Sequence, residues 1–211
     1  MSLWTRSLIG CVSILFAGFG TARAGIILNE NFDELGTAFS AMSVGAFHTL
    51  DGTNVDIVGP SDGFGPLCAA PESGNCVDMD GTGGNPQGML QTVNTITLVP
   101  GVNYYLSFDL IGSQRGFATS TTVTFASYSQ TFSLASGDDS SGIVMDQLIT
   151  VSTPTMTNLT FTSNTPGDYG AILDDVLVTT APEPPAMTMI LMGAALIGFG
   201  MLRIRRKASR T

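Results

Sequence analysis

Apolar and polar residues alternate along much of the chain, most regularly in residues 92–98 (TVNTITL) and 104–110 (YYLSFDL). Successive side chains of a β-strand point to opposite faces, so a period of two indicates a strand with one face on a core. Pro100 and Gly101 lie between the two segments and predict the turn that joins them.

Nine segments are short, contain β-branched or aromatic side chains and are flanked by Gly, Pro, Asn, Asp or Ser, the pattern of strands and turns. They are residues 25–28, 54–58, 89–99, 104–111, 121–127, 130–134, 143–151, 156–162 and 171–178. No segment between residues 25 and 180 carries a helical stripe. The pattern predicts an all-β fold, a two-sheet antiparallel β-sandwich of the jelly-roll type.

The N-terminal residues have a different pattern. Arg6 precedes an apolar stretch at residues 8–19, and Ala22-Arg23-Ala24 follows it. This is the layout of a secretory signal peptide, here residues 1–24 with cleavage after Ala24. Residues 8–11 (LIGC) also match a lipoprotein box that would place lipid on Cys11. That box lies at the start of the apolar stretch instead of at its end, so too little apolar sequence precedes Cys11. This position favours an ordinary signal peptide.

The C-terminal residues predict a single transmembrane helix. Residues 186–202 contain no charge and only Thr188 as a polar side chain. As a helix they would span about 25 Å, slightly less than a hydrocarbon core. Cations follow at once in the basic end, residues 203–211: Arg203, Arg205, Arg206, Lys207 and Arg210. A cationic cluster beside a span stays on the cytoplasmic side, so we expect the preceding domain outside the inner membrane.

Pro182, Glu183 and Pro184 stand just before this span. The order of Pro-Glu-Pro, short apolar helix and basic terminus resembles the PEP-CTERM sorting signal. The resemblance implies recognition by an exosortase, a membrane-embedded transpeptidase-like cysteine protease, in a Gram-negative bacterium that makes exopolysaccharide. It also implies release to the cell surface or matrix. A stiff juxtamembrane spacer fits the same residues, because prolines hold the backbone extended.

The predicted organisation is therefore a signal peptide at 1–24, a β-sandwich domain at 25–180 and a sorting tail at 181–211. Of the chain's 8 Lys and Arg residues, the domain keeps only Arg115, against sixteen of its 17 Asp and Glu residues. Such an acidic surface repels phosphate backbones, which excludes nucleic acid as a partner.

Cys68 and Cys76 are the cysteines that remain after processing, in a Gly- and Pro-rich segment of an exported chain. These features favour a disulfide. A zinc site would need further ligands, and the sole histidine, His48, is no obvious partner.

Three stretches resemble galactose-binding-like jelly rolls, in particular an extracellular family best known from plant cell walls. They are residues 28–33 (LNENFD), residues 77–108, and residues 161–176 ending in Asp174-Asp175-Val176. The resemblance implies a carbohydrate-binding fold. It also implies a structural calcium between the first and last strands, held by Asp33, Asp174 and Asp175. Alternatively, Asp174 and Asp175 cap a turn and face solvent.

Sugar binding requires exposed aromatic rings beside a few polar groups. The candidates in glycine-containing loop segments are Phe64, Phe117 with its neighbour Arg115, and Tyr169. Catalysis finds little support, because His48 lacks a nucleophile motif and the cysteines are expected to be bonded. We therefore expect a non-enzymatic surface or matrix protein that associates with glycan and requires no cofactor. The alternatives are a structural or adhesive protein without a specific ligand, and a glycoside-active enzyme with two carboxyl groups about 5 to 9 Å apart.

Overall fold

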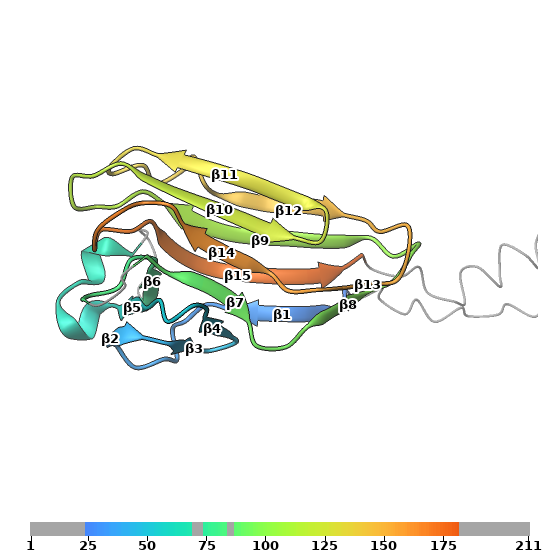
Figure 1. Cartoon of the computed structure of the whole chain (residues 1–211), viewed down its shortest axis with the longest axis horizontal. Helices are drawn as coiled ribbons and strands as arrows, with labels where there is room; N and C mark the ends of the chain where they lie inside the picture. The colour runs from blue at the N-terminus through green and yellow to red at the C-terminus, as the bar shows by residue number, and fades with distance from the viewer. Residues whose placement is uncertain (1–23, 69–73, 84–86, 182–211) are drawn as a thin grey trace, which may run out of the picture. The chain divides into compact units, whose positions relative to one another are not determined.

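Antiparallel sheets face each other and form a β-sandwich, as the alternation predicts (Figure 1). The first sheet has the order β12 (Val144–Ile149), β9 (Tyr104–Ile111), β15 (Ile172–Thr180), β6 (Cys76–Asp78), β5 (Val55–Val58) and β2 (Ala38–Ala41), with β1 (Ile26–Glu30) also paired to β15. The second sheet has the order β11 (Tyr128–Leu134), β10 (Thr119–Phe125), β14 (Thr160–Ser163), β7 (Met89–Thr92), β4 (Phe47–Thr49) and β3 (Ser43–Val44). The prediction of an all-β fold with antiparallel sheets is confirmed.

The computed structural model describes residues 24–68, 74–83 and 87–181. The signal peptide before Ala24, the Pro-Glu-Pro motif, the apolar segment and the basic end lie outside the described residues. Ala24–Ala181 form one unit by internal contacts. In the part of the chain described here, no helix is long and apolar enough to cross a membrane.

Phenylalanine side chains from both sheets fill the space between them. Phe108 of β9 meets Phe161 of β14 edge to face at 5.3 Å, and Phe161 meets Phe47 of β4 at 6.1 Å. Phe132 of β11 and Phe32, which follows β1, extend the chain of rings at its two ends. Edge-to-face pairs add to the burial energy of such large side chains, so the rings join the two sheets into one core.

Two segments that were predicted as single strands are each divided in two. Residues 89–99 form β7 and β8 (Ile96–Leu98), and residues 156–162 contribute to β13 (Thr155–Thr157) and β14. The side chain of Asn158 donates to the carbonyl oxygen of Thr92 at 2.8 Å, and Thr92 N donates to Leu159 O at 3.0 Å. These bonds hold both strands together where they leave the second sheet, and β8 and β13 then pair as a separate two-stranded sheet.

The predicted disulfide between Cys68 and Cys76 is present, with 5.6 Å between the Cα atoms. Cys68 follows the second of two short 3₁₀ helices, η1 (Pro60–Asp62) and η2 (Gly65–Leu67), and Cys76 opens β6. Both cysteines are buried in a small apolar cluster with side chains from β5, β9 and β15. The bond therefore ties the 3₁₀ segment to the first sheet at β6.

Candidate functional site

Three of the four predicted ligand-binding residues meet at one end of the sandwich. Arg115 and Phe117 lie between β9 and β10, and Tyr169 lies between β14 and β15. The rings of Phe117 and Tyr169 are stacked, with centroids 4.8 Å apart and an interplanar angle of 4°. The guanidinium carbon of Arg115 lies 4.5 Å from the centroid of the Tyr169 ring. We call the two stacked rings the aromatic platform.

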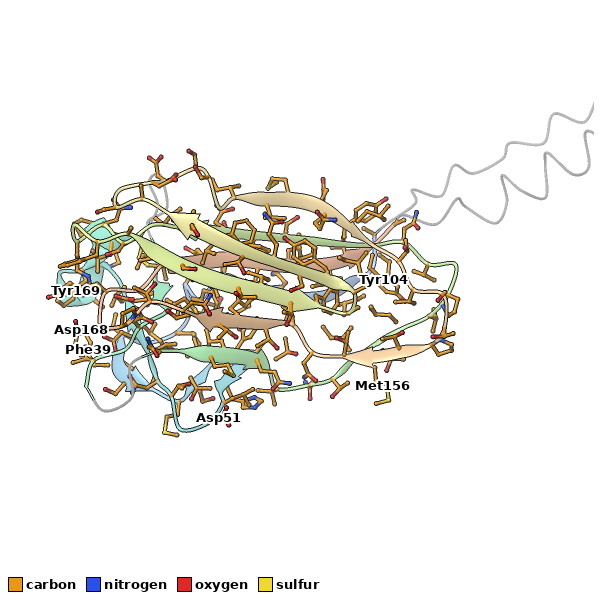
Figure 2. All side chains as sticks on the ribbon, turned by 45° about the horizontal axis from the view of Figure 1, so that its top comes forward. Phe39, Asp51, Tyr104, Met156, Asp168 and Tyr169 are labelled. Carbon is orange, nitrogen blue, oxygen red and sulfur yellow. A yellow bond between two sulfur atoms is a disulfide. The ribbon has the colours of Figure 1, made fainter. Side chains whose placement is uncertain are left out.

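The platform is open to solvent and borders a pocket. Phe117 is 52% exposed and Tyr169 37% exposed, although both are large apolar rings. The pocket has a volume of about 410 Å³ and is lined by Phe117, Ala118, Thr165, Pro166, Gly167, Asp168 and Tyr169. Figure 2 shows Asp168 and Tyr169 at one end of the sandwich, with Tyr104 and Met156 toward the other. Exposed rings beside loop carbonyls and one carboxylate are typical of a ligand site.

Arg115 connects the two loops that carry the platform. Its Nη2 donates to Asp78 Oδ2 in an ion pair and to the carbonyl oxygen of Asp168 at 2.9 Å. Gly116 and Gly167 adopt φ values of 93° and 115°, which glycine reaches without strain. Gly116 directly precedes Phe117, and Gly167 lies two residues before Tyr169, so each loop of the platform has a glycine where its backbone turns.

Asp78 and Asp80 lie beneath the platform, and neither was predicted as a site residue. They are 1% and 0% exposed. Asp78 Oδ1 accepts hydrogen bonds from the amide of Gly170 at 2.9 Å and from the amide of Asp80 at 3.1 Å. The Asp78 carboxylate is therefore bonded to both Arg115 and the residue after Tyr169.

Burial sets the protonation of both aspartates. It raises the pKa of Asp78 to about 7, although Arg115 and the two amides favour the charged form. Burial likewise raises the pKa of Asp80 to about 6, against the Ser163 hydroxyl and Gly88 amide, which lower it. Neither oxygen of Asp80 has a hydrogen bond of normal geometry among the described residues. Desolvation of a carboxylate thus outweighs its local partners here.

Two features of the sequence point to this buried pair. Asp78 and Asp80 are two residues apart after an apolar residue, and residues spaced by two face the same side in extended chain. Arg115 is the only Lys or Arg between residues 25 and 180, so a carboxylate partner was to be expected for it. Which of the sixteen acids would be that partner depends on the fold.

Phe64, the fourth predicted ligand residue, is not part of this site. It lies between the two 3₁₀ helices and packs edge to face on Phe39 of β2, with centroids 5.9 Å apart. Phe64 is not among the residues that line the platform's pocket.

The predicted calcium ligands Asp33, Asp174 and Asp175 are not gathered into one group. Asp33 is exposed after β1 and accepts from the Asn31 side chain at 2.8 Å, whereas Asp175 is exposed at a bulge in β15 with φ 49°. Asp174 is buried, and its Oδ1 accepts from the amide of Asp175 at 2.8 Å. Among the described residues, no three His, Cys, Asp or Glu side chains are placed to hold a metal ion. The structure does not bring the three carboxylates together, and the calcium site implied by the resemblance stays a prediction.

The comparisons with known proteins assign no family. No family model and no curated protein matches the chain. Similar solved structures include the K3 and K1 cleaved adhesin domains of Lys-gingipain from Porphyromonas gingivalis. The K3 domain is 18% identical, with a TM-score of 0.37 and coverage of 74% of this chain and 99% of that domain. The K1 domain is 15% identical, with a TM-score of 0.40 and coverage of 72% and 96%.

An exo-beta-1,3-galactanase from Phanerochaete chrysosporium is also similar, at 14% identity and a TM-score of 0.33. The match covers 74% of this chain but only 29% of the galactanase. At such identities and scores the likeness assigns neither ligand nor activity.

Proposed function

We propose that the protein is an exported, non-catalytic β-sandwich that binds glycan through the aromatic platform. The observation that carries the proposal is the exposed parallel stack of Phe117 and Tyr169 at the rim of a pocket. Large rings are normally buried, and leaving them in water costs free energy unless a ligand covers them. The apolar C–H face of a sugar ring packs on such a surface, while its hydroxyl groups bond to nearby loop oxygens.

The lining of the pocket supports binding over hydrolysis. Glycoside hydrolysis uses a pair of carboxyl groups on either side of the scissile bond. Among the described residues that line this pocket, Asp168 alone carries a carboxylate. Asp78 and Asp80 lie below the platform and are shielded from solvent, so they are poorly placed to reach a substrate.

Location belongs to the same proposal and rests on the sequence. The signal peptide would export the chain, and the span at 186–202 would hold the precursor in the inner membrane. An exosortase acting near Pro182, Glu183 and Pro184 would then release it to the surface or to the exopolysaccharide matrix. A glycan-binding domain is suited to such a matrix, because it would retain the released protein on the polymer.

The platform is tested by alanine substitution and polysaccharide binding. The full chain is purified in a detergent without a sugar head group, since an alkyl glycoside would compete, and is passed over immobilised galactan, glucan and mannan. Phe117→Ala and Tyr169→Ala should each weaken binding at least about tenfold, the loss usual for a central aromatic contact.

Phe39→Ala is the matched control, because Phe39 is also 52% exposed but does not line the pocket. It should bind as the unmodified chain does. Loss of binding in Phe39→Ala alone would move the site to the Phe39 and Phe64 pair. Failure of the unmodified chain to bind any glycan would favour a structural or adhesive protein without a specific ligand.

A further inference from the structure

The Arg115–Asp78 ion pair contacts the loop that carries Tyr169 on both sides of this residue. The guanidinium group of Arg115 binds the carbonyl of Asp168 and lies over the ring of Tyr169. Its partner Asp78 also accepts from the amide of Gly170. The residues before and after Tyr169 are therefore each held by one member of the pair, and the orientation of the ring depends on both.

The backbone of Gly170 packs closely against residues 78–80. A Cβ atom added to Gly170 would lie 2.4 Å from the amide nitrogen of Asp80 and 2.6 Å from Asp78 Oδ1. The end of the Tyr169 loop therefore contacts residues 78–80 directly, at the end of β6.

The same pair decides the charge of the site. Arg115 is the only Lys or Arg of the domain, and Asp78 neutralises it. Asp168 and Asp80 lie close enough to interact electrostatically with one another, and Arg115 acts on Asp80 as well. One cation therefore stands among three carboxyl groups, and the described residues that line the pocket include no cation. A uronate or sulfate group placed on the platform would meet negative charge without a free donor cation.

We infer that the aromatic platform binds uncharged saccharides. In this inference Arg115 is a positioning residue, and Asp78 cancels its charge. The inference rests on the proposed glycan-binding function and names its ligand class. Arg115 acts through Tyr169 and contacts no sugar itself. Arg115 would attract an acidic glycan, and Asp78 cancels that attraction. Removing the Asp78 carboxylate alone should therefore change which glycans the site selects.

The experiment compares neutral and acidic polysaccharides at about pH 8, where Asp78 is ionised. The full chain, in a detergent without a sugar head group, is passed over neutral galactan, glucan and mannan and over polygalacturonate and alginate, at low and high sodium chloride. Retention on at least one neutral polymer, unchanged by salt, and none on the acidic polymers is the expected result. If the chain binds an acidic polymer and sodium chloride abolishes this binding, the inference is overturned, although the proposed glycan binding still holds.

Asp78→Asn tests the role of the pair. The asparagine side-chain oxygen can still accept from the Gly170 amide, but it no longer cancels the charge of Arg115. Because Asp80 and Asp168 still lie near Arg115, we expect only a partial gain of salt-sensitive retention on polygalacturonate in this variant. Adding Asp168→Asn should raise that retention to at least about tenfold above the unmodified chain. A purely structural role would cause loss without such a gain. The double variant with Arg115→Gln should lose the gain, and retention that persists there would refute the assignment.

If Asp78→Asn fails to fold, the panel on the unmodified chain still decides the ligand class. Absence of binding to every polymer, neutral or acidic, refutes the proposed function itself. The two failures are therefore distinguishable.

Discussion

At the scale of the residue, Asp78 links folding to pH. Its pKa is raised from 3.8 to about 7 and that of Asp80 to about 6, mainly by burial. Between about pH 4 and pH 7 the folded chain therefore holds protons that the unfolded chain has released. The resulting stability is fully present below the unfolded pKa and is lost as pH rises through the folded value.

We predict that the protein is more stable to guanidinium at pH 5 than at pH 8, by about 2 to 3 kcal/mol from Asp78. Circular dichroism of the exported protein during unfolding measures the difference. Hydrogen bonds from Ser141 hold the pKa of Asp138 below its usual value. Asp138 therefore changes the stability only at more acidic pH, outside the interval from pH 5 to pH 8. Asp78→Asn should flatten the profile, and an equally steep profile in that variant would refute the argument.

At the scale of the element, the disulfide connects η2 to β6, the short strand that ends in Asp78. A bond that closes a loop with a separation of 8 residues restricts the unfolded chain, in the entropic account by about 2 to 3 kcal/mol. Reduction should therefore lower the melting temperature of the exported protein.

Thiol labelling provides the second measurement of this bond. Without reductant, neither Cys68 nor Cys76 of the exported protein should react with an alkylating reagent, as judged by intact mass. After reduction and unfolding, both should react. Labelling of both in the native, unreduced protein would mean that the bond does not form.

The elements also show which strands a sequence can predict. Residues 104–111 were predicted as a strand and form β9 with the same bounds, because alternation over eight residues is unambiguous. In contrast, β2 (Ala38–Ala41), β3 (Ser43–Val44), β4 (Phe47–Thr49) and β6 (Cys76–Asp78) were missed. Strands of two to four residues are too short to show a clear alternation, so the sequence alone does not distinguish them from loops.

The same limit applies to the candidate site. Phe117 with its neighbour Arg115 and, independently, Tyr169 were predicted from their loop setting, and the structure brings all three together. Asp78 was missed because the burial of a carboxylate depends on the partner that the fold supplies, and Arg115 lies 37 residues away. The local sequence pattern thus predicts which residues could form a ligand site. Strand pairing decides which of these residues lie in contact.

At the scale of the whole molecule, the acidic domain precedes the predicted span in the sequence and the basic end follows it. Seventeen largely apolar residues followed by cations do not leave a bilayer spontaneously, because the charges would have to cross the hydrocarbon core. Release of the proposed glycan-binding domain into a matrix would therefore require a cut outside the predicted span. Pro182, Glu183 and Pro184 are the residues that resemble such a processing signal.

We predict that a cell with an exosortase yields mature protein lacking residues 186–211, and that a cell without one retains the protein in the inner membrane. Glu183→Ala should block release without blocking insertion, because insertion depends on the apolar segment and the basic end. Glu34→Ala is the matched control, since Glu34 is exposed on the domain and outside the motif. Intact mass of surface and membrane fractions decides the outcome. A full tail on released, lipid-free protein would show that residues 186–202 are not a span, and normal release of Glu183→Ala would reduce the motif to a spacer.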